Sequence, residues 1–207
     1  MGGLKKGESV LIHNAGGGVG LAALDLSLHL EATTYGTSSA KKHSFLRERG
    51  LNHPIDYRNQ DFVSSIMSLT KGKGVELIID PIGGKNWKKS YKALRSTGRL
   101  GMFGVSTVTD STAGKMVQFA KLLMHTPLYN PLQLMNANKS VFGVNLGHMW
   151  GERKKISGWM HEILKGVEEG WIRPHVDRAF PFEQAGEAHA YIEARKNIGK
   201  VVLVTGG

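Results

Sequence analysis

The residues best placed to do chemistry are a cluster of glycines near the start of the chain. Residues 10–12 are an apolar run of strand length, residues 14–20 read Asn-Ala-Gly-Gly-Gly-Val-Gly, and a helical pattern follows. A strand, a glycine turn and a helix in this order provide the context that a dinucleotide-binding fingerprint needs. Gly17 and Gly20 would let the backbone turn tightly and approach a pyrophosphate, and the helix amino end would present N–H groups to it. The alternative is a plain tight turn; the flanking strand and helix favour the dinucleotide interpretation.

The end of the expected second strand indicates which dinucleotide binds. An NAD-selective site usually carries an acidic residue about 20 positions after the glycines, but residues 36–42 read Gly-Thr-Ser-Ser-Ala-Lys-Lys. A 2′-phosphate favours hydrogen-bond donors and positive charge, so Ser38, Lys41 and Lys42 predict NADP(H) rather than NAD(H). The alternative is that Ser38 and Ser39 only cap the next helix and that both lysines are solvated.

Alternating strands and helices must position these residues. Apolar and β-branched runs predict strands at residues 10–12, 33–37, 54–57, 75–80, 99–104 and 140–144. Apolar residues at helical spacing predict helices at residues 19–30 and 40–49, from residue 61 to Gly72, and around residues 87–94. This rhythm implies a parallel sheet covered on both faces, with strand order 3-2-1-4-5-6. The expected fold class is therefore α/β, a Rossmann-type doubly wound sheet.

Tyr57 ends the third strand of this sheet, beside the corner that holds Ser38. Its ring fits a contact with the ribose phosphate and a plain packing role equally well.

The pattern changes after the fifth strand. Residues 115–125 predict a helix, and residues 126–138 are punctuated by prolines. Residues 152–169 predict a long amphipathic helix with four side chains facing inward, Ile156, Met160, Ile163 and Val167. A strand at 176–180, a helix at 183–194 and a strand at 200–204 do not complete a domain by themselves. We therefore expect a dinucleotide-binding domain over residues 1–146 and a linking helix with a C-terminal segment over residues 147–207.

The composition limits the class of protein. The chain has 207 residues, of which 41% are hydrophobic and 21% charged, as is ordinary for a globular domain. It has no apolar run of ~18 residues that could span a membrane, and residues 1–7 lack the apolar core of a signal peptide. The chain has no cysteine, which allows an intracellular location, and we expect the cytoplasm.

The net charge of +10 has four interpretations: a solvated basic surface, an anionic cofactor, nucleic acid or acidic lipid. The basic residues are spread along the chain without regular aromatic interleaving, so nucleic acid is not predicted. Nothing specific supports association with a membrane.

The nine histidines do not indicate a metal site, because no pair is spaced i, i+4 and no cysteine accompanies them. His13 follows a buried strand and is expected to be a packed core residue, whereas His125, His148 and His161 are expected on the surface. Spacing alone supports no Ser-His-Asp arrangement and no general acid, so the catalytic residues are unknown at this stage.

Motifs along nearly the whole chain carry a family resemblance. They are residues 4–13, the glycine turn at 14–20, residues 36–39 with Lys42, and residues 55–58, 79–84, 98–100, 180–185 and 195–203. In this order and spacing the sequence resembles the cofactor-binding half of the medium-chain dehydrogenases/reductases. It is most similar to the zinc-free quinone oxidoreductase branch, which includes zeta-crystallin and the vesicle amine transport protein-like proteins; residues 138–146 resemble the latter.

Two features depart from the family pattern. Asn14 stands where many members have alanine or glycine, a small change that the turn is expected to tolerate. The family begins with a catalytic domain of GroES-like fold, and only the segment from about His175 onward corresponds to it here. The resemblance therefore implies a Rossmann-type domain plus a C-terminal segment of an incomplete GroES-like catalytic domain, in either a cloned piece or a natural truncation.

The resemblance implies NADPH as the cofactor and hydride transfer to a quinone or an α,β-unsaturated carbonyl. By family position, the residues that face the pyrophosphate are Gly17, Gly18, Val19 and Gly20, and those that face the 2′-phosphate are Ser38, Lys42 and Tyr57. The residues near the nicotinamide ribose are Gly104, Val105 and Ser106, and those near the nicotinamide or substrate are Phe142, Val144 and Asn145. From the returning C-terminal segment, the residues that contact the cofactor are Asn197 and Lys200. It also implies a homodimer through the edge strand at residues 140–144, an edge that invites pairing on physical grounds.

Three hypotheses of function follow. The first is an NADPH-dependent oxidoreductase of the quinone or enone type. The second is a nucleotide-binding or interaction module without turnover, which the missing catalytic half would favour. The third, ranked lower, is a reductase domain of a larger synthase.

Overall fold

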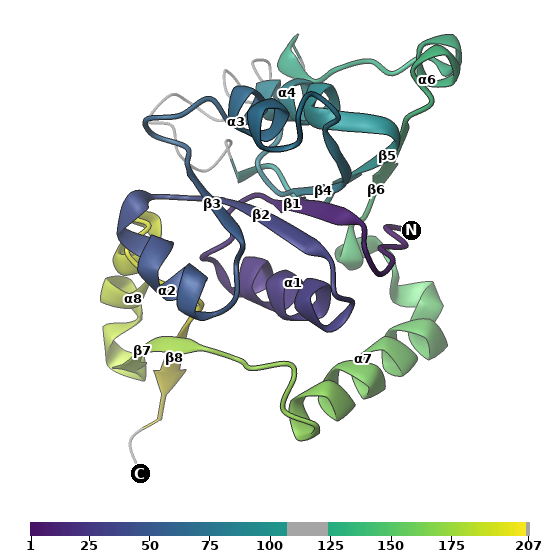
Figure 1. Ribbon diagram of the computed structural model, residues 1–207. Coiled ribbons are helices and arrows are strands. Elements are labelled where there is room, and N and C mark those ends of the chain that lie inside the picture. The colour runs from purple at the N-terminus through teal and green to yellow at the C-terminus, as the bar shows by residue number, and fades with distance from the viewer. Residues whose placement is uncertain (107–123, 206–207) are drawn as a thin grey trace.

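The computed structural model describes residues 1–106 and 124–205, and a parallel sheet runs through its centre (Figure 1). Its strands are β1 (Ser9–Ile12), β2 (Thr33–Ser38), β3 (His53–Asp56), β4 (Val75–Asp80), β5 (Leu94–Met102) and β6 (Ser140–Gly143). Neighbouring strands are parallel throughout, in the order β3-β2-β1-β4-β5-β6. The predicted strand order and doubly wound fold class are confirmed.

Helices cover both faces of this sheet (Figure 1). One face carries α1 (Gly18–His29) and α2 (His43–Glu48), and the other carries α3 (Phe62–Leu69) and α4 (Lys85–Ala93). Alternate residues of a strand therefore enter different cores. Leu11 packs with Phe62 and Ile66 under α3, whereas its neighbours Val10 and Ile12 pack with Leu24 under α1.

The C-terminal segment returns to the carboxyl ends of the sheet strands, beside the glycine turn that follows β1. There β7 (Val176–Pro181) and β8 (Lys200–Val204) form a parallel pair with α8 (Ala185–Glu193) beside them. An isolated bridge joins Gly17 to Gly199, and the Gly199 amide donates to the Gly16 carbonyl at 2.9 Å. This contact brings the C-terminal segment over the turn between β1 and α1.

The long helix α7 (Arg153–Glu168) corrects one expectation, because its predicted inward face is largely exposed. Met160 is 52% exposed, Ile163 41% and Val167 37%, while Ile156 is half-buried. The helical period identifies which apolar side chains share a face, but it cannot tell whether another element covers that face.

Sequence reasoning also missed α6 (Pro131–Ala137), which lies in the stretch read as punctuated by prolines. Asn130 accepts a hydrogen bond from the Gln133 amide at 2.8 Å, and Pro131 occupies the first helical turn. An N-cap followed by proline is a helix start signal, so this signal was available.

Other element boundaries also differ from the predictions. Strand β5 begins at Leu94 and ends at Met102, so Gly104 lies beyond it. The helix expected after β2 is divided into a 3₁₀ turn, η1 (Ala40–Lys42), and α2, and its N-cap Ser39 makes no side-chain capping bond. Most of the helix predicted at 115–125 lies outside the described residues.

Candidate cofactor-binding site

The glycine turn brings the end of β1 against the start of α1. Asn14 adopts a positive φ of 52°, and its carbonyl accepts from the Gly17 amide at 2.9 Å. A Cβ on Gly20 would lie 2.3 Å from the Asn14 oxygen, so the helix can approach the turn this closely only with glycine there. Helix α1 begins with no side-chain cap and no acidic residue in its first turn. Its amino end therefore favours an anionic ligand.

Two lysines lie against this turn. A Cβ on Gly18 would meet the Lys200 Cε at 2.6 Å, and a Cβ on Gly16 would meet the Lys42 Cδ at 2.8 Å. Two cationic side chains thus approach the electropositive end of a helix, an arrangement that an anion such as a pyrophosphate would stabilise.

A cleft of about 360 Å³ opens beside the turn. Predicted residues that line it are Gly18, Val19, Gly20, Asn197 and Lys200, and other lining residues include His13, Pro81 and Phe103. The structure therefore brings the glycine turn, the loop after β4 and the returning C-terminal segment to one cavity.

A basic corner lies at the ends of β2 and β3. Ser38 is buried at the end of β2, and its carbonyl accepts from the Tyr57 amide at 3.3 Å. Burial raises the pKa of the Tyr57 hydroxyl, but hydrogen bonds with Arg58 and Arg195 outweigh this effect and bring that pKa below its usual value. The Arg58 guanidinium also lies 5.9 Å from the centre of the Tyr57 ring.

Lys42 completes this corner, and its ammonium donates to the Asn197 carbonyl. Burial lowers the pKa of Lys42; Tyr57 and Asp177 oppose the shift, whereas Arg195 and Arg58 add to it. A phosphate bound in this corner would stabilise the charged form of Lys42, because an anion offsets both its burial and the repulsion from the two arginines.

Two functional candidates escaped sequence reasoning. Arg58 and Arg195 belong to the basic corner through Tyr57, yet they lie far apart in the sequence. Arg58 belongs to the motif at residues 55–58, at the end of β3, and its position next to Tyr57 was the available signal. Nothing local could reveal Arg195, because only the return of the C-terminal segment brings it to β3.

The residues predicted near the nicotinamide ribose lie next to the cleft. Ser106 donates its amide to the Pro81 carbonyl at 3.0 Å, and a Cβ on Gly104 would lie 3.0 Å from the same oxygen. Val105 approaches Gly83 in the same loop pair. These residues pack on the loop whose Pro81 lines the cleft.

Phe142, Val144 and Asn145 do not line the cleft. Phe142 lies over Gly101, whose Cβ would be 2.6 Å from the Phe142 ring, and it packs against the core under α1. The Val144 amide donates to Met102 at 2.9 Å, and the Asn145 side chain accepts from the Gly147 amide at 3.1 Å. Their contact with nicotinamide or substrate stays a prediction.

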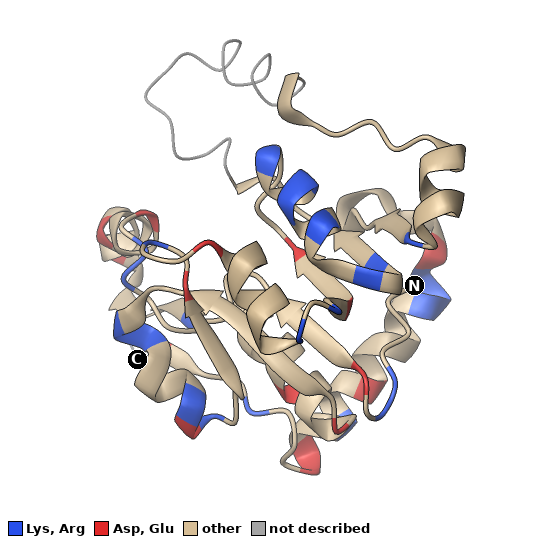
Figure 2. Cartoon of the chain, turned by 45° about the horizontal axis from the view of Figure 1, so that its top comes forward, with Lys and Arg blue, Asp and Glu red and all other residues tan. Residues whose placement is uncertain are grey.

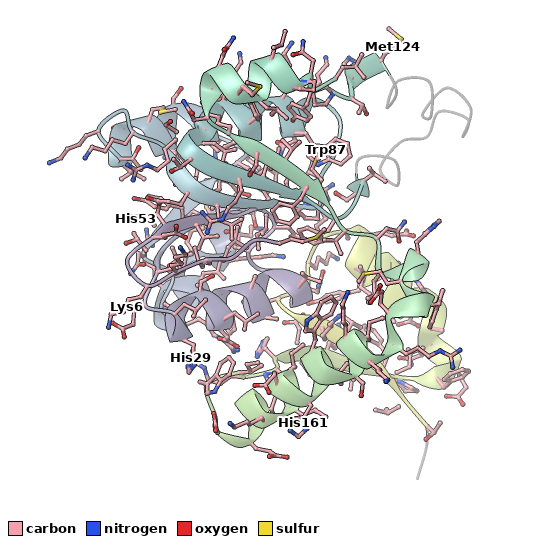
Figure 3. The ribbon with its side chains drawn as sticks, turned by 90° about the vertical axis from the view of Figure 1, so that its right-hand side faces the viewer. Lys6, His29, His53, Trp87, Met124 and His161 are labelled. Carbon is pink, nitrogen blue, oxygen red and sulfur yellow. The ribbon has the colours of Figure 1, made fainter. Side chains whose placement is uncertain are left out.

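The histidines divide as follows. His13 is 2% exposed, as expected of a packed core residue. His148 and His161 are exposed, and Figure 3 shows His161 projecting outward from α7. His125 is half-buried. Within residues 1–106 and 124–205, no group of three His, Asp or Glu side chains gathers that could hold a metal ion.

No helix in the described part of the chain is long and apolar enough to cross a membrane.

Comparison with known proteins identifies the family. A family model described as zinc-binding dehydrogenase matches residues 49–203. The chain belongs to the medium-chain dehydrogenase/reductase superfamily. Its relatives, among them VAT-1 homologs and a 2-haloacrylate reductase, support the zinc-free branch of that superfamily.

Individual relatives agree with this assignment. The human synaptic vesicle membrane protein VAT-1 homolog is 38% identical over 99% of this chain and 52% of its own length. The 2-haloacrylate reductase of Burkholderia sp is 31% identical over 97% of this chain and 56% of its own length. Mycobacterial Rv1454c, solved in complex with NADPH, superposes with a TM-score of 0.79 at 27% identity, over 98% of this chain and 59% of that one. The chain thus spans about half the length of the curated relatives it matches.

Proposed function

We propose that this chain is the cofactor-binding half of an NADPH-dependent oxidoreductase that transfers hydride to a quinone or an α,β-unsaturated carbonyl. The observation that carries the proposal is the basic corner, where Lys42, Tyr57, Arg58 and Arg195 gather beside Ser38. No carboxylate follows β2 in residues 36–42, so a 2′-phosphate would meet donors and cations there, without the repulsion that an NAD-type acidic residue would impose.

Each part of the site would act on a different part of the cofactor. The amino end of α1 and the Lys200 ammonium would hold the pyrophosphate, with Gly18 leaving room for the Lys200 side chain and Gly20 allowing α1 to approach the turn closely. Bound NADPH would supply the hydride from its nicotinamide ring. The loops that carry Pro81 and Phe103 would close one side of the cleft and keep water from the ring.

The names of two relatives support the choice of cofactor and acceptor. One structural relative was solved with NADPH. Another relative is a 2-haloacrylate reductase, and a haloacrylate carries a carbon–carbon double bond conjugated to a carboxyl group, as the double bond of an enone is conjugated to its carbonyl. Because this chain spans about half of these relatives, turnover of the whole protein depends on more than the described site. We propose the cytoplasm as the location of the protein.

The alternative is a nucleotide-binding or interaction module without turnover. The placement of Phe142, Val144 and Asn145 outside the cleft favours it. NADPH binding without reduction of a quinone or enone by the full-length protein would select this alternative.

A fluorescence titration with NADPH and NADH, at low and moderate salt, tests the proposal. We expect NADPH to bind about tenfold or more tightly than NADH, because charge-assisted hydrogen bonds to the 2′-phosphate exist only for NADPH. Lys42→Gln should remove most of this preference. Lys41→Gln is the matched control, since Lys41 is exposed on the same 3₁₀ turn. Equal affinity for the two dinucleotides would contradict the proposal.

A further inference from the structure

A buried chain of hydrogen bonds runs from the glycine turn to the loop after β4. The His13 Nδ1 lies 3.0 Å from the Thr37 hydroxyl, and its Nε2 lies 3.0 Å from the Ser90 hydroxyl. Ser90 in turn donates to Asp80 Oδ2 at 2.7 Å. Ser90 and Asp80 are fully buried, and His13 almost so. Burying polar groups costs free energy unless they are paired, and here each buried group is paired with the next one.

The hydrogen positions in this chain follow from the donor inventory. The Ser90 hydroxyl has one hydrogen, which it gives to Asp80, so it must accept from His13 Nε2–H. His13 is neutral, because burial lowers its pKa; the Asp80 carboxylate opposes this shift and Lys89 adds to it. The neutral ring then carries no hydrogen on Nδ1, which accepts from the Thr37 hydroxyl.

Each end of this series of hydrogen bonds contacts groups near the cleft. Thr37 Oγ1, having given its hydrogen to His13, can accept from the Asn14 amide at 3.4 Å. Asn14 is the residue with positive φ at the start of the glycine turn. At the other end, Asp80 Oδ1 accepts from the Ile82 amide and Oδ2 from the Asn86 side chain, both at 2.8 Å.

We propose that His13 is a positioning residue, which in its neutral Nε2–H form couples the glycine turn to the loop after β4 and holds Asn14 in the conformation that binds phosphate. The effect on NADPH affinity rests on the proposed function, whereas the tautomer and the coupling do not. The Asp80 carboxylate sets the direction of donation along these hydrogen bonds, because a carboxylate can only accept hydrogen bonds.

The first test needs no ligand. ¹⁵N NMR of the full chain at neutral pH should report a protonated Nε2 and an unprotonated Nδ1 for His13. In Asp80→Asn the amide can donate to Ser90, which reverses the chain, and His13 should change to the Nδ1–H tautomer. An Nδ1–H ring or an imidazolium in the unchanged protein would overturn the proposal, whether or not the variant folds.

The second test measures the coupling. Ser90→Ala should shift the Asn14 amide resonance and weaken NADPH binding about three- to tenfold, the range typical of coupling through packed networks. Ser27→Ala is the matched control, because Ser27 is also a buried helical serine but donates only to the Ala23 carbonyl at 2.6 Å.

Three outcomes can be distinguished. An Asn14 resonance in Ser90→Ala that is no more displaced than in Ser27→Ala would overturn the coupling. If the unchanged protein binds no NADPH, the proposed function fails, and the tautomer and the Asn14 resonance still decide the role of His13. If NADPH binds equally well to both serine variants, the coupling does not affect phosphate binding, and the proposed role of His13 in cofactor binding is overturned.

Discussion

Gly20 shows how the absence of a single side chain shapes the site. Its Cα faces the Asn14 carbonyl and the Ala15 backbone, where an added Cβ would lie 2.3 and 2.7 Å from the nearest atoms. Both neighbours are backbone, so neither can move aside as a flexible side chain could. The distance between the turn and α1 is therefore set by this glycine.

We predict that Gly20→Ala lowers the free energy of unfolding by about 1–3 kcal/mol, the usual cost of overpacking, and abolishes detectable NADPH binding by displacing α1. Thermal unfolding and the NADPH titration measure the two effects. Gly158→Ala is the control: this α7 position has open space for a Cβ, and alanine should stabilise the helix by about 0.5–1 kcal/mol. A Gly20→Ala protein of unchanged stability would contradict the packing argument.

Among the elements, a buried ion network fixes the C-terminal segment to the sheet domain. Asp25 of α1 accepts from the Arg49 side chain at 2.7 and 3.1 Å and from the Arg173 amide at 2.9 Å. The Asp25 side chain is 1% exposed and that of Arg49 10%. The segment that leads to β7 is thereby tied to α1 and to the residue after α2.

Removing the Asp25 charge should therefore be costly. We predict that Asp25→Asn reduces the free energy of unfolding by about 3 kcal/mol, because Arg49 would remain buried without its partner. Urea denaturation measures this loss. The exposed pair between Lys6 and Glu31 provides the comparison, since its side chains are 75% and 64% exposed, and Lys6→Ala should cost less than about 1 kcal/mol. Equal effects from the two variants would argue against the network.

The whole molecule presents an open sheet edge and a dispersed positive charge. Strand β6 is the last strand of the six-stranded sheet, and its pairing groups on one side meet no further strand in the described part of the chain. Lys and Arg occur on several elements, interspersed with Asp and Glu (Figure 2), which fits a solvated basic surface better than one concentrated patch.

We propose that two copies pair through β6, and Gly143→Glu tests this arrangement. Gly143 has room for a side chain, since a Cβ there would meet only the Met102 carbonyl, at 3.9 Å. Two carboxylates brought together at a two-fold edge should raise the Kd of the dimer by about tenfold or more. Analytical ultracentrifugation measures this change, and Gly151→Glu, at a position with open space and outside β6, is the control. A chain that is monomeric before substitution would refute the pairing.

Local sequence determined the sheet and the glycine turn. The apolar runs at β1 and β4, the glycines from Gly16 to Gly20 and the strand–helix rhythm were sufficient to predict the parallel order of six strands. They were sufficient because period, turn chemistry and strand length act over a few residues, and because the handedness of strand–helix–strand connections leaves few topologies. Ser38, Lys42 and Tyr57 were predicted for the same reason, because each lies at or just after the carboxyl end of β2 or β3, and their contact with a 2′-phosphate stays a prediction.

Tertiary structure alone decided what covers each surface and what meets across the chain. The amphipathic pattern of α7 was read correctly, but the exposure of Met160 depends on which elements pack there. Arg195 joins Tyr57 because the C-terminal segment returns to the ends of β2 and β3, and Ser90 joins His13 because α4 packs against the end of β1. Side-chain period is a local property, whereas burial and hydrogen-bond partnership depend on segments distant in sequence, and no local pattern specifies them.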